Sequence, residues 1–311
     1  MSAPTIRFGL QAGFDTDSRA WLDLAKKAED AGFDALYVAD HLGVTASPFA
    51  ALAAAAGATS TLKLGTYVLN VGVRDPLSIA SDAATVDALS SGRFILGLGA
   101  GHTPVEWSMT GREYPTAAER VGRLAETVDV VTRLLAGEVV THHGRYVHLD
   151  DAFLLTPRPV QGAIPLLIGG NGRQVLRLAA RSADIVGLSG LGRTLEDGHR
   201  HEAQWSEAAI TERVGLVRDA SPTPTRPILD ALVQHVRITD HRDTAAERLA
   251  QFVAGPTPAE ILGAPYALIG TLDQLADELL QHYERWGFTS YVVRADVIDA
   301  AAALIDRIRS A

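Results

Sequence analysis

The sequence alternates eight times between a short apolar segment and a longer segment with helical periodicity. The apolar segments are rich in aliphatic and β-branched residues, as is typical of parallel strands that are buried on both faces. They cover 5–11, 33–40, 62–71, 93–99, 164–170, 184–190, 227–238 and 289–294. The helical segments cover 18–32, 47–60, 75–92, 116–136, 172–183, about 200–220, 271–286 and 296–309. This α/β pattern predicts a (β/α)8 TIM barrel, with a doubly wound parallel sheet as the alternative.

Local signals at the ends of the elements agree with this pattern. Ser18 is a plausible N-cap of the first helix, and Gly32 follows its end. Two segments interrupt the alternation: 138–155 resembles a β-hairpin, and 239–265 is polar and is expected to be irregular. A chain of 311 residues is long enough for one large core, so we expect a single barrel domain over 1–311.

Composition excludes several classes of function. The net charge is −9 and there is no Lys/Arg-rich run, so the chain lacks the basic surface that nucleic-acid binding needs. It contains no cysteine, which fits a cytoplasmic protein. No apolar run is long enough for a membrane span, and the first residues lack a signal-peptide pattern. We therefore expect a cytoplasmic protein that acts on a small molecule rather than on nucleic acid or a membrane.

Small and polar residues follow the predicted strands, at the end where the chemistry of a TIM barrel is found. Because the carboxyl ends of parallel barrel strands meet at one rim, these residues are expected to lie together. They are Gln11, Ala12 and Gly13; Asp40 and His41; Asn70, Val71 and Gly72; Gly99, Gly101 and His102; Gly169 to Gly172; Ser189 and Gly190; His235; and Arg294. Such a rim suits a large flat ligand that approaches the backbone closely.

Two glycine-rich loops stand at this rim. The loop 97–101 does not match the dinucleotide fingerprint, because His102 occupies the third glycine position and Pro104 follows. Its glycines more plausibly let a ring pass close to the backbone. The turn 169–175, GGNGRQV, enters a helix, so free N–H groups and Arg173 can face a phosphate. The alternative is an ordinary Gly-rich turn with a solvated Arg173.

The histidines do not indicate a metal site. His142, His143 and His148 lie on the hairpin-like segment, where alternation directs His142 and His143 to opposite faces. The segment 199–205, HRHEAQW, lacks the second histidine of the metalloprotease motif. Asp40 and His41 are candidates for proton handling, with an N-cap aspartate beside a solvated histidine as the alternative.

Five segments together resemble the luciferase-like monooxygenase superfamily, most closely its branch that uses the deazaflavin coenzyme F420. They are AEDAGFDALYVADHL (28–42), LGTYVLNVGVRDP (64–76), GRFILGLGAG (92–101), PLLIGGNG (165–172) and GTLDQLADELLQHYERWGF (270–288). They occur in the family's order and cover nearly the whole chain. The resemblance implies a TIM barrel with F420, or alternatively FMN, at the carboxyl ends of the strands.

The resemblance also implies roles for individual residues. Asp40 corresponds to a residue near the pyrimidine edge of the ring, and His41 to the histidine near the reacting ring carbon. The bond Tyr67–Val68 corresponds to a non-proline cis peptide behind the ring. The other cofactor-binding positions that it implies are Asn70, Gly99, Gly101, Gly170, Asn171, Gly172 and Arg173.

His102 departs from the family pattern. It stands where the sugar-phosphate dehydrogenases of the family carry a catalytic glutamate, which argues against glucose 6-phosphate as substrate. With an unperturbed pKa of about 6.5, a histidine can transfer a proton itself. We therefore expect an F420-dependent oxidoreductase with His41 and His102 as proton carriers and with Tyr67, Trp107 and Leu191 on the substrate side. The alternatives are an FMN-dependent luciferase-like monooxygenase and a non-catalytic cofactor-binding protein.

We also expect a homodimer. The segment AALAAAAGA (50–58) has small side chains that permit close approach of a second helix, and members of the resembled family commonly pair through neighbouring helices. The alternative is that this helix packs on its own barrel.

Overall fold

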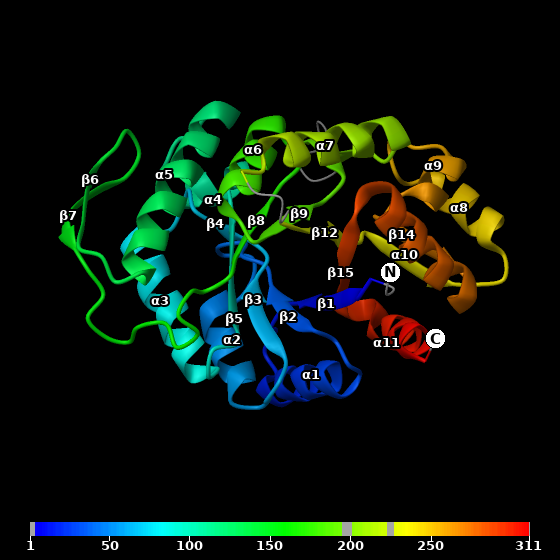
Figure 1. Ribbon diagram of the computed structural model, residues 1–311, viewed down its shortest axis with the longest axis horizontal. Helices are drawn as coiled ribbons and strands as arrows, with labels where there is room; N and C mark the ends of the chain where they lie inside the picture. The colour runs from blue at the N-terminus through cyan, green and yellow to red at the C-terminus, as the bar shows by residue number, and fades with distance from the viewer. Residues whose placement is uncertain (1–3, 195–200, 223–226, 311) are drawn as a thin grey trace.

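The computed structural model describes residues 4–194, 201–222 and 227–310 and contains a closed parallel barrel (Figure 1). The strands of its main sheet are β1 (Arg7–Ala12), β2 (Ala35–Val38), β3 (Lys63–Thr66), β4 (Leu69–Asn70), β5 (Phe94–Gly99), β8 (Leu166–Gly169), β9 (Ile185–Leu188), β12 (Ile228–Leu232) and β15 (Phe288–Arg294). Their order is β3-β2-β1-β15-β12-β9-β8-β5-β4, and a further β3–β5 pairing closes the ring. Since β3 and β4 are two parts of one barrel strand, the predicted eight-stranded TIM barrel is confirmed and the doubly wound alternative is wrong.

Helices surround the barrel and cover the outer faces of its strands (Figure 1). They are α1 (Ser18–Asp30), α2 (Pro48–Ala56), α3 (Pro76–Leu89), α5 (Ala117–Leu135), α6 (Arg173–Ser182), α7 (Glu207–Ala220), α10 (Leu272–Trp286) and α11 (Ile298–Arg309). Capping boxes begin α5, at Thr116 and Glu119, and α10, at Thr271 and Gln274. The N-cap of α1 is Asp17 rather than the predicted Ser18, because the Asp17 carboxylate accepts the N–H groups of Arg19 and Ala20.

Tyrosine side chains fill the interior of the barrel. Tyr37 and Tyr67 pack edge to face, with ring centroids 5.4 Å apart. The Tyr67 hydroxyl donates to Asp230 Oδ1 at 2.9 Å, and the Ser290 hydroxyl donates to Asp230 Oδ2 at 2.6 Å. Burial raises the pKa of Asp230 to about 6, against the opposing effect of these two hydrogen bonds. The side chain of Tyr67 therefore belongs to the barrel core and not to the substrate side that we predicted for it.

The third barrel strand is interrupted between β3 and β4. The peptide bond Tyr67–Val68 is cis, as predicted. Next to the break, the Thr66 hydroxyl donates to the carbonyl of Gly97 at 2.9 Å and accepts the N–H of Gly97 at 2.8 Å. This side chain thereby replaces ladder hydrogen bonds that the interrupted strand cannot make. Gly97 must approach closely, since a Cβ there would overlap the carbonyl oxygen of Thr66.

Two predicted elements in the second half have different boundaries. The segment 227–238 forms two strands: β12 ends at Leu232, and β13 (His235–Ile238) pairs with β14 (Ala267–Gly270) in a separate small sheet. Gln234, not His235, therefore faces the barrel strand β15 at the rim, with its Oε1 3.4 Å from Arg294 Nη2. The helix predicted near 200–220 begins at Glu207, after a strand β11 (His201–Ala203) that pairs with β10 (Leu191–Thr194). Residue 200, at the start of that prediction, lies outside the described residues.

Short helices occupy two segments where none was predicted. The segment 239–265 contains α8 (Arg242–Ala250) and α9 (Pro258–Gly263), and α4 (Pro104–Met109) follows β5. Their buried faces are too small to produce a periodic pattern: α8 buries only Ala246, and α9 buries only Ile261. The predicted hairpin is confirmed as β6 (Val140–His143) and β7 (His148–Ala152), and it projects from the barrel (Figure 1).

The helix expected at a dimer interface packs largely within the chain. In α2, Ala51, Leu52, Ala55 and Ala56 are all buried, and the Trp21 indole N–H donates to the carbonyl of Ala51 at 2.9 Å. The small side chains thus serve close packing on the barrel, which was the alternative. The homodimer stays a prediction. Among the described residues, no helix is both long and apolar enough to cross a membrane.

Candidate active site at the mouth of the barrel

Four of the predicted polar positions lie together at the carboxyl ends of neighbouring strands. Asp40 and His41 follow β2, Asn70 ends β4, and His102 follows β5. β2 pairs with β3, and both β3 and β4 pair with β5, so the fold brings these residues to one part of the rim. For these four residues the structure agrees with the predicted position after a barrel strand, and their roles in a site stay predictions.

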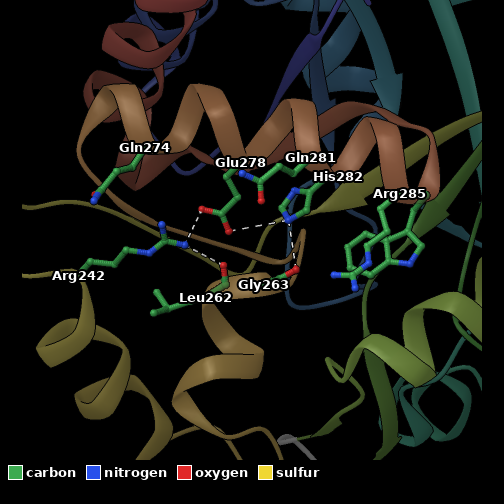
Figure 2. A pocket seen from close by; sticks show the side chains of 9 residues that line it. Arg242, Leu262, Gly263, Gln274, Glu278, Gln281, His282 and Arg285 are labelled. Carbon is green, nitrogen blue, oxygen red and sulfur yellow. Dashed lines mark hydrogen bonds and ion pairs between the residues drawn. The ribbon is translucent and has the colours of Figure 1, made fainter.

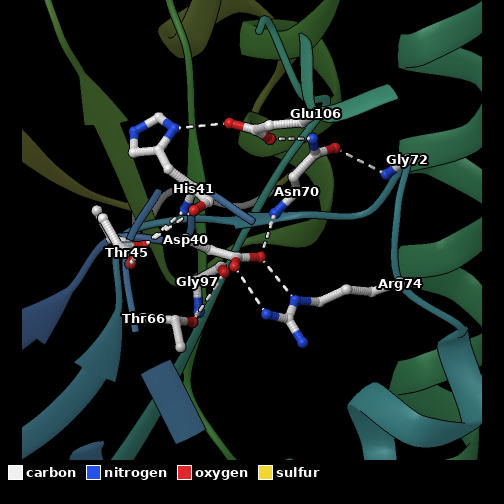
Figure 3. A network of polar contacts seen from close by, with 10 residues as sticks. Asp40, His41, Thr45, Thr66, Asn70, Gly72, Arg74, Gly97 and Glu106 are labelled. Carbon is white, nitrogen blue, oxygen red and sulfur yellow. Dashed lines mark hydrogen bonds and ion pairs between the residues drawn. The ribbon is translucent and has the colours of Figure 1, made fainter. Parts of the chain in front are cut away.

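Asp40 is buried and its carboxylate is fully engaged. Arg74 donates from Nε to Asp40 Oδ2 at 2.6 Å and from Nη2 to Oδ1 at 2.7 Å, and the N–H of Asn70 donates to Oδ2 at 3.2 Å (Figure 3). Asp40 is not the N-cap of α2, which is Ser47. The bidentate pair with Arg74 braces the ends of two strands against the loop that precedes α3.

His41 is paired with a carboxylate that the sequence analysis did not single out. Its Nδ1 lies 2.7 Å from Oε1 of Glu106, on α4, and Nδ2 of Asn70 donates to Oε2 of Glu106 at 2.6 Å (Figure 3). Glu106 is 1% exposed. The hydrogen bond to Glu106 raises the pKa of His41 despite partial burial. Burial alone would raise the pKa of Glu106, but its hydrogen bonds from His41 and Asn70 outweigh that effect and lower it.

His102 stands beside His41 in a different electrostatic environment. The ring centroids of the two histidines are 6.0 Å apart, and the ring of His201 lies 5.4 Å from that of His102 on the other side. Partial desolvation, followed by the two neighbouring imidazoles, lowers the pKa of His102. The mouth therefore contains two adjacent imidazoles whose pKa values are pushed in opposite directions. Neighbouring groups of this kind divide acid and base roles between them.

The floor of the mouth is formed at the break between β3 and β4. Val68 lies between two strand ends whose glycines leave room for it: a Cβ on Gly99 or on Gly169 would come within 3 Å of the Val68 side chain. Gln11 Nε2 donates to the carbonyl of Tyr67 at 2.6 Å, and Arg294 donates to Oε1 of Gln11. The barrel thus ends in a tightly packed floor with an arginine at its edge.

The predicted phosphate turn begins α6, with Gly172 at the N-cap position. Asn171 is buried, its Nδ2 donates to Oε1 of Gln204 at 3.0 Å, and its Oδ1 has no hydrogen-bond partner among the described residues. Arg173 is exposed and donates through Nε to Oε1 of Glu212 at 3.0 Å. Arg173 is thus exposed and paired with a surface carboxylate, and its contact with a phosphate stays a prediction.

Trp107 does not line the mouth, so that expectation is wrong. It is 1% exposed and packs where Gly72 lacks a side chain. Its place on α4 next to Glu106 explains the difference, since the helix turns this residue into the wall of the barrel while Glu106 faces the strand ends.

A small cavity lies outside the barrel, between α10 and the α8–α9 segment (Figure 2). Its volume is about 90 Å³, and Glu278, His282 and Arg242 are among its lining residues. Arg242 Nη2 donates to Oε2 of Glu278 at 3.1 Å, and burial raises the pKa of Glu278 to about 8. A volume of this size holds a few water molecules, so the cavity is far too small for a flavin. Among the described residues, no group of three or more potential metal-ligand side chains occurs.

Comparison with known proteins now decides the family. A family model described as luciferase-like monooxygenase matches residues 5–290. The chain belongs to the luciferase-like monooxygenase family. The F420-dependent glucose-6-phosphate dehydrogenase of Intrasporangium calvum is 33% identical to this luciferase-like chain over 288 residues, which are 88% of the chain and 81% of that relative.

Two further proteins are similar to this chain, with different sequence identities and different shares of the chain covered. The F420-dependent glucose-6-phosphate dehydrogenase of Nakamurella multipartita is 36% identical over 193 residues, and there the match spans 59% of this chain but only 56% of the relative's length. The coenzyme F420-dependent tetrahydromethanopterin reductase from Methanopyrus kandleri superposes with a TM-score of 0.76, at 23% identity, over 97% of each chain. Because the identity to this reductase is only 23%, the comparison shows that the two proteins share a fold and does not show that they share a substrate.

The position of Glu106 corrects one conclusion drawn from the sequence of this luciferase-like protein, namely that the site has no carboxylic acid. The presence of His102 in place of a glutamate suggested that the site lacks a carboxylic acid. Instead, a carboxylate reaches the site from four residues further along the chain. The signal for it was weak: a glutamate in a six-residue segment that begins with Pro104.

Proposed function

We propose that this protein is an oxidoreductase that uses the deazaflavin coenzyme F420 and acts on a small organic substrate at the mouth of the barrel. The observation that carries the proposal is the pair His41 and His102, adjacent at 6.0 Å between ring centroids, with a raised and a lowered pKa respectively. Relatives named as F420-dependent dehydrogenases support the choice of coenzyme.

The residues of the mouth fit such a coenzyme. Gly99 and Gly169 leave room for Val68, which provides an apolar surface between them for a flat ring. The buried Oδ1 of Asn171 lacks a partner among the described residues, and a buried polar atom of this kind is satisfied when a ligand donates to it. The start of α6 at Gly172 offers backbone N–H groups to a phosphate.

The bound coenzyme supplies the ring carbon that accepts or donates a hydride. The protein's own residues handle the accompanying proton. His102, which is neutral at neutral pH, takes the proton of a substrate hydroxyl when the adjacent carbon loses its hydride, and returns it in the reverse reaction. His41, whose charged form is favoured by its contact with Glu106, donates a hydrogen bond and stabilises negative charge that develops at the mouth.

Binding of the two candidate coenzymes tests this proposal. We expect purified protein to bind F420 saturably, at least tenfold more tightly than FMN, when fluorescence is followed during titration. A panel of alcohols, aldehydes and sugar phosphates, with deazaflavin absorbance as readout, then identifies the substrate class. Binding of FMN alone, with reduced FMN and oxygen consumed together, favours the FMN-dependent monooxygenase. Tight binding without turnover on any substrate favours a non-catalytic binding protein.

The pair Arg173 and Glu212 leads to a prediction about coenzyme affinity. Replacing Arg173 with Ala removes a charge-assisted contact to phosphate, so we expect F420 affinity to fall about tenfold at low salt. Glu212 competes with the phosphate for Arg173, since its Oε1 accepts from Arg173 Nε and its Oε2 accepts from Arg213. Glu212→Gln is therefore expected to bind F420 at least as tightly as the unmodified protein.

A matched control separates this effect from general surface charge. Arg177→Ala removes a cation one turn further along α6 and should leave the affinity unchanged. Equal F420 affinity of the Arg173→Ala protein and the unmodified protein, measured at low ionic strength, would show that the phosphate binds elsewhere.

A further inference from the structure

Glu106 is a buried carboxylate whose two oxygens both face groups of the candidate active site. Oε1 is 2.7 Å from His41 Nδ1, and Oε2 accepts from Asn70 Nδ2 at 2.6 Å. The orientation of the Asn70 amide is determined by a third bond, because its Oδ1 accepts the N–H of Gly72 at 2.9 Å (Figure 3). Its NH2 group must then point to Glu106 and cannot be exchanged with the oxygen.

We propose that Glu106 is a positioning residue that orients His41, so that Nδ1 faces Glu106 and Nε2 is presented to the mouth of the barrel. This inference rests on the proposed function, because it concerns the same site. It adds a division of labour: Glu106 favours the charged form of His41, while His102 is the residue that takes and returns the substrate's proton. Glu106 itself contacts no substrate.

The contact with Glu106 determines which nitrogen of His41 faces the carboxylate and which faces the mouth. An ionised carboxylate only accepts hydrogen bonds, so Nδ1 of His41 must carry a hydrogen to form the 2.7 Å contact. The Nε2 atom lies on the opposite side of the ring from Nδ1 and so points away from Glu106. This arrangement is the usual way in which a carboxylate selects the tautomer and orientation of a histidine.

Several other charges act on His41, and Glu106 has the largest effect among them. Asp40 lies next to it in sequence and favours its charged form, while Arg294, from β15, disfavours it. His102 is in ring contact with it, and His201 is in ring contact with His102. Asp40 is also engaged in the bidentate contact with Arg74, whereas Glu106 contacts His41 directly and has the larger effect on its pKa.

The first test uses the coenzyme-free protein and follows the imidazole signals by NMR as the pH is changed. We expect His41 to titrate at a higher pH than His102 in the unmodified protein. In Glu106→Gln, which retains the shape but removes the charge, the midpoint of His41 should fall by on the order of one pH unit. Glu106→Asp should restore part of that shift. Glu113→Gln, at an exposed position nearby, should leave the midpoint unchanged.

The second measurement, the kinetics of the coenzyme-loaded enzyme, shows whether a failure concerns the role of Glu106 or the proposed function. In the loaded enzyme, Glu106→Gln should shift the pH profile of kcat/KM and lower kcat while coenzyme affinity changes little. If His41 and His102 titrate in the reverse order in the unmodified protein, or if His41 titrates alike with and without Glu106, the positioning role is overturned. If the NMR shift occurs but no deazaflavin turnover is found with any substrate, the positioning role stands and the proposed function fails. If Glu106→Gln does not fold, the inference is tested by whether His41 titrates at a higher pH than His102 in the unmodified protein.

Discussion

His102→Ala is expected to lower kcat by about 10²–10⁴-fold while F420 affinity changes little, because general acid–base assistance contributes factors of this size. The physical reason is position and charge state together. His102 follows the glycines at the end of β5, beside the position that the proposed function assigns to the coenzyme ring. Its pKa is lowered from the ordinary value, so it is neutral and able to accept a proton at pH 7. His41 is expected to contribute less to this step, because the hydrogen bond from Nδ1 to Glu106 favours its protonated form.

The measurement is steady-state kinetics of His102→Ala and His102→Gln, with coenzyme affinity determined separately by fluorescence. Tyr114→Phe is a suitable control, because it removes only the hydrogen bond from the Tyr114 hydroxyl to the carbonyl of His102, 3.0 Å, and so tests whether loop structure alone matters. Turnover within about threefold of the unmodified enzyme, with an unchanged pH profile, would exclude proton transfer by His102. His41 would then be the remaining candidate.

Gly97→Ala is expected to destabilise the folded protein by about 3 kcal/mol or more, as measured by urea unfolding of the coenzyme-free protein. Its Cβ would overlap the carbonyl oxygen of Thr66, which is backbone and cannot turn aside. The two hydrogen bonds between the Thr66 side chain and Gly97, at 2.9 Å and 2.8 Å, hold β3 to β5 at the break, so the strands would have to separate there.

The matched control for this prediction is Gly215→Ala. A Cβ at Gly215, within α7, meets nothing within 4 Å, so the substitution should stabilise the helix by about 0.5–1 kcal/mol. Opposite signs for the two variants would confirm that the contact with Thr66 is responsible. Equal stability of the Gly97→Ala and unmodified proteins would mean that the barrel can open at the break without loss.

The polar residues of the rim could be predicted because barrel topology converts position in sequence into position in space. Any residue directly after a parallel strand reaches the same end of the barrel, so Asp40, His41, Asn70 and His102 were found without knowledge of the packing. The bounds of α8 and α9 could not be predicted, because helices with a single buried residue lack an apolar stripe. The prediction for Trp107 failed for a related reason, since a six-residue helix shows no periodicity that tells its inner face from its outer face.

The alternation of apolar and amphipathic segments was enough to predict the architecture, and the residues that follow the strands were enough to predict where a candidate site lies. Which side chains contact one another became visible only in the folded chain. His41 and Glu106 are 65 positions apart, and Arg173 and Glu212 are 39 positions apart, yet each pair is in contact. Such pairings depend on how loops and helix starts are packed against each other, and a pattern of hydrophobic spacing carries no information about them. The pKa of His41 is raised by its contact with Glu106 and that of His102 is lowered by desolvation and by neighbouring imidazoles, so both directions follow from the folded arrangement.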